Sequence, residues 1–319
     1  MKQLAIETSC DETSLALLDG ATLVTHLVSS QINDHKAYGG VVPEIASRKH
    51  TETIHSLLRT LFKNANWQWS DLTHISVTQG PGLEGALLVG ISVAKTMATI
   101  LSIPIIPVNH LHGHIYSIFL DYPQTSFPFI ALLVSGGHSM IIHATDHFKF
   151  TVLGSTRDDA IGEAFDKVAR LLGLPYPGGP AIDALAKEGN PSAFQFPQAL
   201  KNKGLDLSFS GLKSAVWRTV NECSGSIPVA DIAASFQKAA CDSLISKTKQ
   251  ACQLTDTDSV IICGGVSANS YLRKHLAALA PSMEFCTDNA AMIGQAAYYM
   301  VQQNIPFSQS FNVNSSASL

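Results

Sequence analysis

The sequence predicts an α/β fold made of a duplicated unit, with two lobes and mixed central sheets. Two passages share one order of elements: an apolar strand, a small polar hairpin, two further strands and then helices. The chain has 319 residues, more than one hydrophobic core usually holds. Its 46% hydrophobic and 14% charged residues are typical of a compact protein. We expect an N-terminal lobe over 1–120, a C-terminal lobe over 128–300, a linker over 121–128, and a C-terminal segment over 301–319 with a disordered tail.

The first passage opens on an apolar strand over Lys2–Glu7, followed by the polar loop Thr8–Thr13. Two strands and two helices complete it, at Ser14–Asp19, Ala21–Ser29, Thr53–Asn64 and Gly85–Ile100.

The second passage repeats this order from the strand Phe129–Val134 and the hairpin Ser135–His138. Strands follow at Ser139–His143 and Phe148–Gly154, and helices at Ile161–Leu172 and Pro180–Glu188. A later strand, Ser259–Cys263, ends in a glycine turn before a helix over Tyr271–Ala280.

The bulk composition narrows the function classes. The formal charge of −4 lacks the basic excess of a protein that binds nucleic acid unaided. Six cysteines without paired spacing are typical of reduced thiols. The chain opens on a strand pattern without a signal-like segment, and the apolar stretch over 86–108 contains Lys95 and two prolines. We therefore expect a soluble, cytoplasmic protein that does not span a membrane.

His110 and His114 follow an apolar strand at a spacing of four residues, which places both rings on one face of a helix. Two imidazoles so placed can hold one metal ion. A zinc protease requires Glu directly after the first His, where this chain has Leu111, so peptidase chemistry is disfavoured. On a helix His112 points away and does not ligate. Two histidines satisfied by hydrogen bonds remain the alternative.

Two glycine pairs follow predicted strands. Gly136 and Gly137 allow backbone amides to approach an anion, with the hydroxyl of Ser135 beside them. The pair Gly264–Gly265 precedes Asn269, whose amide can bond a ribose or a base edge. Ordinary turns are the alternative for either loop.

Carboxylates form a third set of candidates. Asp11 and Glu12 occupy the first hairpin, where they suit a metal, a ribose hydroxyl or a nucleophile to be deprotonated. Asp166 and Asp183 suit ribose hydroxyls, or are simple helix carboxylates. Asp288 is expected at a helix N-cap, and it becomes a third metal ligand only if the fold brings it to the histidines.

Two segments could contact partners, and each also has an ordinary structural explanation. Arg48, Lys49 and His50 either receive a phosphate backbone or form a solvated basic face. The segment Thr53–Phe62 carries apolar residues at helical spacing, which are either a docking face or core.

Nine motifs resemble, in order and over nearly the whole chain, those of the bacterial TsaD family, the tRNA N6-adenosine threonylcarbamoyltransferases. They lie at Ile6–Ser14, Gly39–Glu44, Gly80–Leu83, Asn109–His114, Leu133–His138, Gly178–Pro180, Ser208–Lys213, Gly264–Asn269 and Asp288–Met292. The resemblance implies an actin/hexokinase/Hsp70-like (ribonuclease H-like) fold.

By this resemblance, His110, His114 and Asp288 ligate one divalent ion, Fe²⁺ or Zn²⁺, and Asp11 and Glu12 belong to the catalytic hairpin. The nucleotide and substrate contacts implied are Leu133, Val134, Ser135, Gly136, Gly137, Asp166, Gly179, Asp183 and Asn269. His112 stands where the family usually has Glu, and we expect it to tune the surroundings of the metal without loss of function.

The resemblance implies transfer of threonylcarbamoyl from threonylcarbamoyl-adenylate to N6 of the adenosine 3′ of the anticodon in ANN-decoding tRNAs, with release of AMP. It also implies a heterodimer with a TsaB-like paralogue through the N-terminal lobe, a TsaE-like ATPase, and tRNA contacts that include Arg48 and Lys49. Two other classes compete. A sugar or acetate kinase of the same fold would lack the histidine pair, and a scaffold paralogue would lack the metal residues.

Overall fold

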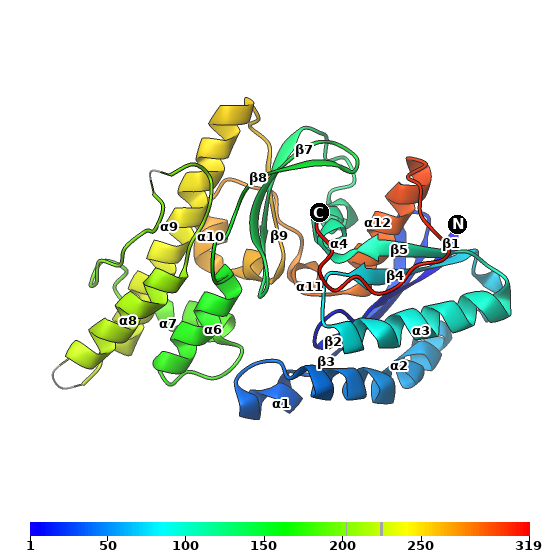
Figure 1. The fold of residues 1–319 in the computed structure, drawn as a ribbon, viewed down its shortest axis with the longest axis horizontal. Helices are drawn as coiled ribbons and strands as arrows, with labels where there is room; N and C mark the ends of the chain where they lie inside the picture. Colours follow the sequence, from blue (N-terminus) through cyan, green and yellow to red (C-terminus); the bar gives the residue numbers. More distant parts are fainter. Residues whose placement is uncertain (202, 224–225) are drawn as a thin grey trace. The chain divides into compact units, whose positions relative to one another are not determined.

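The chain forms two compact units, one comprising Met1–Thr125 with Pro281–Leu319 and the other Ser126–Ala280 (Figure 1). The structure is a computed structural model, and it describes residues 1–201, 203–223 and 226–319. Each unit contains one mixed sheet with helices packed against it, which confirms the predicted duplicated α/β class.

The sheet of the first unit has the order β3-β2-β1-β4-β5. Its strands are β1 Lys2–Glu7, β2 Glu12–Asp19, β3 Thr22–Ser30, β4 His74–Gly80 and β5 Ile105–Asn109. The first three form an antiparallel meander, whereas β4 lies parallel to β1 and β5 parallel to β4. The carboxyl ends of β1, β4 and β5 therefore meet at one edge of the sheet, where the loops can carry a site.

Helices cover this sheet with apolar residues from α2 (Pro43–Ala65), α3 (Glu84–Leu101) and α12 (Ala290–Gln302). The shorter helical segments of the unit are α1 Ile32–His35, η1 Lys36–Tyr38, η2 Trp69–Asp71, α4 His110–Tyr116, α5 Ile118–Asp121 and α11 Met283–Cys286. Helix α3 is long and apolar enough to cross a membrane by length and composition, and its face with Ala86, Leu87, Ile91 and Ala94 is buried in the unit.

The second unit repeats the meander and its parallel neighbour in the sheet order β8-β7-β6-β9. Its strands are β6 Phe129–Val134, β7 Ser139–Asp146, β8 Lys149–Ser155 and β9 Val260–Cys263. Its helices are α6 Ile161–Leu171, α7 Gly178–Ala186, α8 Ser210–Glu222, α9 Val229–Thr255, η3 Gly265–Ala268 and α10 Ser270–His275.

The predicted boundary of the C-terminal lobe was wrong, because residues 281–300 belong to the first unit and not to a lobe over 128–300. Helix α12 packs against β1, β2 and α4, so the last helix of the chain closes the core of the N-terminal unit. The chain first passes from one unit to the other between Thr125 and Ser126, which lies within the predicted linker over 121–128.

The segment predicted to end in a disordered tail contacts the first unit. Phe311 is buried in the core of this unit, and the backbone of Asn312 and Asn314 bonds to Gln79 of β4. Apolar residues in an otherwise Ser-rich segment explain the difference, because burial of one phenylalanine can hold a polar strand in place.

Helix α2 begins at Pro43, ten residues before the predicted start at Thr53. Proline at the first position favours this start, because its missing N–H costs no helical bond there. The helix therefore contains Arg48, Lys49 and His50, and its apolar residues Ile54, Leu58, Leu61 and Phe62 are core. Of the two readings of Thr53–Phe62, the core is the one observed.

Candidate functional site

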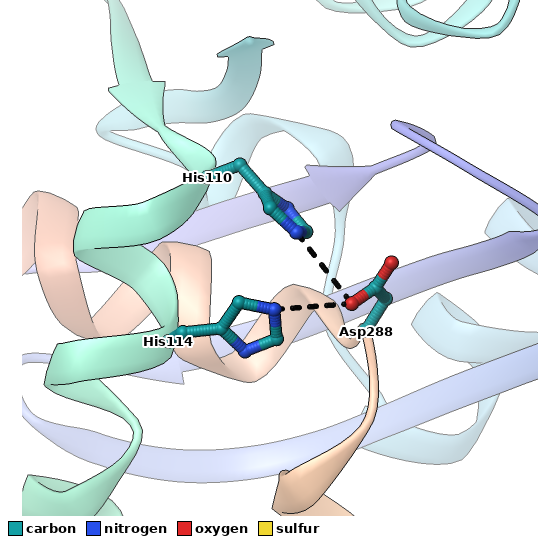
Figure 2. A group of neighbouring side chains, drawn as sticks. All are labelled: His110, His114 and Asp288. Atoms are coloured by element: carbon teal, nitrogen blue, oxygen red, sulfur yellow. Dashed lines mark ion pairs between the residues drawn. The ribbon is translucent and has the colours of Figure 1, made fainter. Parts of the chain in front are cut away.

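His110, His114 and Asp288 converge in the first unit, as the sequence predicted (Figure 2). Both histidines lie on α4, one turn apart, and their ligand atoms and that of Asp288 all lie within 4.8 Å of one another. Nε2 of His114 lies 3.2 Å and Nε2 of His110 3.6 Å from Oδ1 of Asp288. His112, on the same helix, is not a member of this group.

The helix that carries the histidines begins directly at the end of β5, because Asn109 caps it. Its side-chain oxygen accepts a hydrogen bond from the backbone N–H of Leu111 at 2.8 Å. Asp288 was predicted as the cap of α12, but Asn289 performs that role by accepting a bond from Met292 N. The carboxylate of Asp288 instead lies beside the two histidines.

The donor set fits a single metal ion. His114 is fully buried, yet among the described residues neither of its ring nitrogens makes a hydrogen bond of normal geometry. Its ion-pair partner in this group is the Asp288 carboxylate at 3.2 Å, and a cation beside both side chains would satisfy them together. The group is compatible with one metal ion, and the bond of His110 to Glu7 leaves the alternative of hydrogen-bonded histidines open.

Sequence reasoning missed a fourth residue of this group, Glu7 at the end of β1. Its fully buried carboxylate accepts from Ser9 N and Thr78 Oγ1, and Oε2 lies 3.1 Å from Nδ1 of His110. Burial alone would lower the pKa of His110, but the charges of Asp288 and Glu7 outweigh it and raise this pKa to about 9. A glutamate in an apolar strand just before a polar hairpin was the available signal.

The acidic hairpin lies at the same edge of the sheet. Asp11 is buried at its end, and Glu12 is the half-buried first residue of β2. Burial, followed by the charges of Asp11 and Asp288, raises the pKa of Glu12 well above its usual range. Asp288 is among the charges that raise this pKa, so the hairpin lies within electrostatic reach of the histidine group.

Arg48, Lys49 and His50 do not share one surface in the folded chain. His50 is buried, where it contacts Thr13 Oγ1 at 2.8 Å and the carbonyl of Cys10 at 2.9 Å. It supports the acidic hairpin and cannot contact a nucleic acid. Lys49 pairs with Asp34 and Glu52 on the surface, and the exposed Arg48 also lies near Glu52.

The two glycine loops of the second unit lie side by side. Strands β6 and β9 pair in parallel, with Leu133 opposite Cys263, so both loops leave the same edge. A Cβ on Gly264 would lie 2.4 Å from the carbonyl oxygen of Val134, and this glycine has a φ of 88°, so the turn requires glycine. Gly136 and Gly137 are exposed, and a Cβ on either would meet nothing within 4 Å.

The polar residues beside these loops already have partners in the protein. Asp166 Oδ1 accepts from Gly178 N at 2.7 Å, and Asp183 Oδ1 accepts from the backbone and the hydroxyl of Ser270. Asn269 caps α10 through Leu272 N, and its amide donates to Gln237 Oε1 at 2.8 Å. These bonds support the cap alternative. The hydroxyl of Ser135 also has a partner, His138 N, whereas a Cβ on Gly179 would meet nothing within 4 Å. Nucleotide contact by any of these residues stays a prediction.

The chain matches the family model described as tRNA N6-adenosine threonylcarbamoyltransferase over residues 22–295. It is 51% identical over 310 residues to the tRNA N6-adenosine threonylcarbamoyltransferase of Desulfitobacterium hafniense (strain Y51), covering 93% of this chain and 91% of that protein. The protein of the same name from Clostridium botulinum (strain Hall) is 50% identical over the same shares.

Solved structures of similar fold include component A of the (R)-2-hydroxyglutaryl-CoA dehydratase of Acidaminococcus fermentans, with a TM-score of 0.58 and 13% identity over 95% of this chain and 98% of that one. Full-length HypF has a TM-score of 0.62 and 15% identity over 97% of this chain and 47% of its own. These likenesses support the actin/hexokinase-like fold class predicted from the sequence. The chain belongs to the TsaD family of tRNA N6-adenosine threonylcarbamoyltransferases.

Proposed function

We propose that this chain transfers the threonylcarbamoyl group of threonylcarbamoyl-adenylate to N6 of the adenosine 3′ of the anticodon in ANN-decoding tRNAs. The amine attacks the carbamoyl carbon, a C–N bond forms, the bond from that carbon to the phosphate oxygen breaks, and AMP leaves. Family membership supports the reaction, and the group of His110, His114 and Asp288 is the observation in this chain that carries it. That histidine pair also opposes the kinase and scaffold alternatives.

One divalent ion, Fe²⁺ or Zn²⁺, is proposed to bind His110, His114 and Asp288. A bound ion would act as a Lewis acid that polarises the carbonyl of the threonylcarbamoyl group. Other residues of the chain orient these proposed metal ligands. Glu7 accepts from Nδ1 of His110, which leaves Nε2 to face Asp288.

Asp11 is proposed to accept the proton that leaves the N6 amine, with Glu12 as the second candidate. The raised pKa of Glu12 supports placing it second, because burial and the neighbouring negative charges disfavour its carboxylate form. His50 positions the hairpin by holding the carbonyl of Cys10.

The adenylate portion is proposed to bind at the glycine loops of the second unit, where the amides of Gly136 and Gly137 are open to a phosphate. Leu133 and Val134 bring the hairpin to the sheet edge, and Gly179, the second residue of α7, faces open space. Asp166, Asp183 and Asn269 would contribute through their remaining polar atoms or by shaping the loops.

The proposed partners are tRNA, a TsaB-like paralogue and a TsaE-like ATPase, with a cytoplasmic location and no membrane. A groove of about 440 Å³ on the first unit supports a protein partner. Ile54, Leu58 and Trp69 line it together with Val93, Met97 and Ile100 of α3, and Ile100 is 75% exposed. The exposed apolar surface for a heterodimer is therefore mainly on α3, and not on the buried face of α2.

Mass spectrometry of tRNA nucleosides tests the proposed reaction. An ANN-decoding tRNA is incubated with threonylcarbamoyl-adenylate and the chain, with and without the two partners. We expect modification by the complete set, loss of it in His110→Ala and Asp11→Asn, and little change in the surface control Glu188→Gln. Modification that persists in His110→Ala would contradict the assignment of the site.

A further inference from the structure

The C-terminal strap, which we define as Gln309–Ser318, follows the sheet of the first unit to the metal group. Figure 1 shows this red segment passing β4 and β5 and ending beside α4. Gln309 Oε1 accepts from Ile105 N at the start of β5, and Ser318 O accepts from Asn109 at its end. The strap therefore bonds to both ends of β5, the edge strand of the sheet, and satisfies the backbone N–H of Ile105.

Phe311 anchors the strap. Its ring is buried in the core of the first unit, and Lys95 of α3 lies over it at 4.7 Å from the ring centroid. The ammonium group of Lys95 also donates to the carbonyl oxygen of Phe311. Burial of this side chain holds the remaining polar residues of the strap in register.

The middle of the strap clamps the loop after β4. Gln79 bonds to it twice, donating to Asn312 O at 2.9 Å and accepting from Asn314 N at 3.0 Å. A Cβ on Gly80 would lie 1.8 Å from Asn314 O, so this approach requires glycine.

The far side of the same loop contacts the neighbourhood of His110. A Cβ on Gly82 would lie 2.6 Å from Ser9 O, which also accepts from Leu83 N. The hydroxyl of Ser9 lies 3.2 Å from Nδ1 of His110. The loop is thus held between the strap and a residue in contact with a metal ligand.

The end of the strap reaches α4 directly, through Asn109. This side chain has two partners of opposite kind: Oδ1 accepts from Leu111 N and caps α4, whereas Nδ2 donates 2.8 Å to Ser318 O. The bond to the strap fixes the amide orientation in which the oxygen faces the helix. His110 is the first residue of that helix and His114 lies one turn later.

We propose that the strap is a positioning element for the metal group, with Asn109 as the residue that transmits its position to α4. Docking of the strap holds the N-terminus of α4, so both histidines meet Asp288 without reordering when the ion binds. A short helix of seven residues is marginal alone, so an external hold on its first turn has a large effect on its order. This inference rests on the metal site proposed above.

One shortened chain and one substitution test the positioning role of the strap. A variant that ends at Ser315 retains the Phe311 anchor and loses the bond to Asn109. Asn109→Ser keeps a capping oxygen and loses the donor to Ser318. In metal-free protein, amide hydrogen exchange over residues 110–117 should become about fivefold faster in both, as expected for loss of one hydrogen bond.

Chelator competition with Zn²⁺ gives the second measurement. We expect affinity to fall about tenfold in both variants, the size of effect usual for groups that orient a ligand. Ser316→Ala, at an exposed position of the strap, should match the wild type. Leu61→Ala, in the core of α2, should lower overall stability without selectively weakening Zn²⁺ affinity.

The outcomes separate the strap from the metal site. Exchange and affinity within about twofold of the wild type in both variants would overturn the positioning role. Equal loss in Leu61→Ala would do the same, because the effect would then be general destabilisation. If the wild-type chain fails to bind Zn²⁺, the proposed metal site is wrong, and hydrogen exchange alone decides whether the strap orders α4.

Discussion

The carboxylate of Glu7 lies 3.1 Å from Nδ1 of His110, and neither side chain is exposed by more than a tenth. Hydrogen bonds from Ser9 N and Thr78 Oγ1 hold this carboxylate from two other directions. The imidazole is therefore fixed with Nδ1 as the donor to Glu7 and Nε2 facing Asp288. The ring orientation of one proposed metal ligand, at the end of β5, is set by a residue of β1, two strands away in the sheet order.

The first prediction concerns Glu7→Gln, which removes the negative charge and retains the shape. We expect affinity for Zn²⁺ to fall about 10- to 100-fold, because the ligand imidazole becomes less basic and less well oriented. Chelator competition measures the change, and the exposed Glu44→Gln of α2 is the matched control. Equal affinities for the two variants would mean that Glu7 does not orient His110.

The second prediction concerns pH and His74, which is buried at the start of β4. Burial, together with the positive N-terminus, lowers its pKa to about 4. Since its unfolded pKa is about 6.5, the unfolded chain takes up a proton before the folded chain as pH falls, and stability decreases between those values. Above about pH 7 the effect is absent because both states are neutral.

Urea unfolding of metal-free protein tests the role of His74. Between about pH 7.5 and pH 5, the free energy of unfolding of the wild type should fall by about 2 kcal/mol more than that of His74→Gln. The comparison with the variant removes the contributions of other buried histidines. Parallel pH profiles for the two proteins would contradict the proposed burial cost.

The third prediction compares two helical glycines. A Cβ on Gly90 of α3 would lie 2.4 Å from Thr8 Oγ1, whereas one on Gly211 of α8 would meet nothing within 4 Å. Gly90→Ala should cost about 1–3 kcal/mol by overpacking. Gly211→Ala should stabilise by about 0.5–1 kcal/mol because alanine restricts the unfolded chain. Unfolding midpoints measure both, and equal effects would contradict the packing of α3 on the β1 loop.

The repeated meander and the His110–His114 pair could be predicted because local patterns specify them: strand alternation, glycine at a turn, and a spacing of one helical turn. The membership of 281–319 in the first unit could not, because nothing local indicates which core a terminal helix joins. The docking of α12 on β1 depends on contacts across the whole chain. The contacts of the strap are equally long-range, and its single buried residue, Phe311, lies in a polar segment that gives no local sign of burial.

For individual site residues, too, the local sequence indicated the side-chain chemistry but not the long-range contacts. From its own surroundings Asp288 could be recognised only as a helix-start residue, because the contact with His114 joins positions far apart in sequence, and only the family resemblance pointed to that contact. His50 was placed on a basic surface since its neighbours are Arg48 and Lys49, but the periodicity of the longer α2 turns it inward. Asn269 has the chemistry of a ribose ligand, yet α10 and Gln237 occupy its amide.

The last prediction tests the phosphate role of the hairpin Ser135–His138 in the second unit. The bonds from Ser135 N to His138 O and from His138 N to Ser135 Oγ close this turn, and they do not involve Gly137. Since a Cβ on Gly137 meets nothing within 4 Å, Gly137→Val should fold with an unfolding midpoint close to that of the wild type. Its branched side chain would occupy the space through which a phosphate approaches the amides, so affinity for AMP should fall at least about tenfold in calorimetry.

Gly173→Ala is the contrasting variant, because its φ of 70° strains the fold at an open position outside the hairpin. It should lower stability and leave AMP affinity unchanged, and unaltered AMP binding by Gly137→Val would show that the hairpin does not contact phosphate.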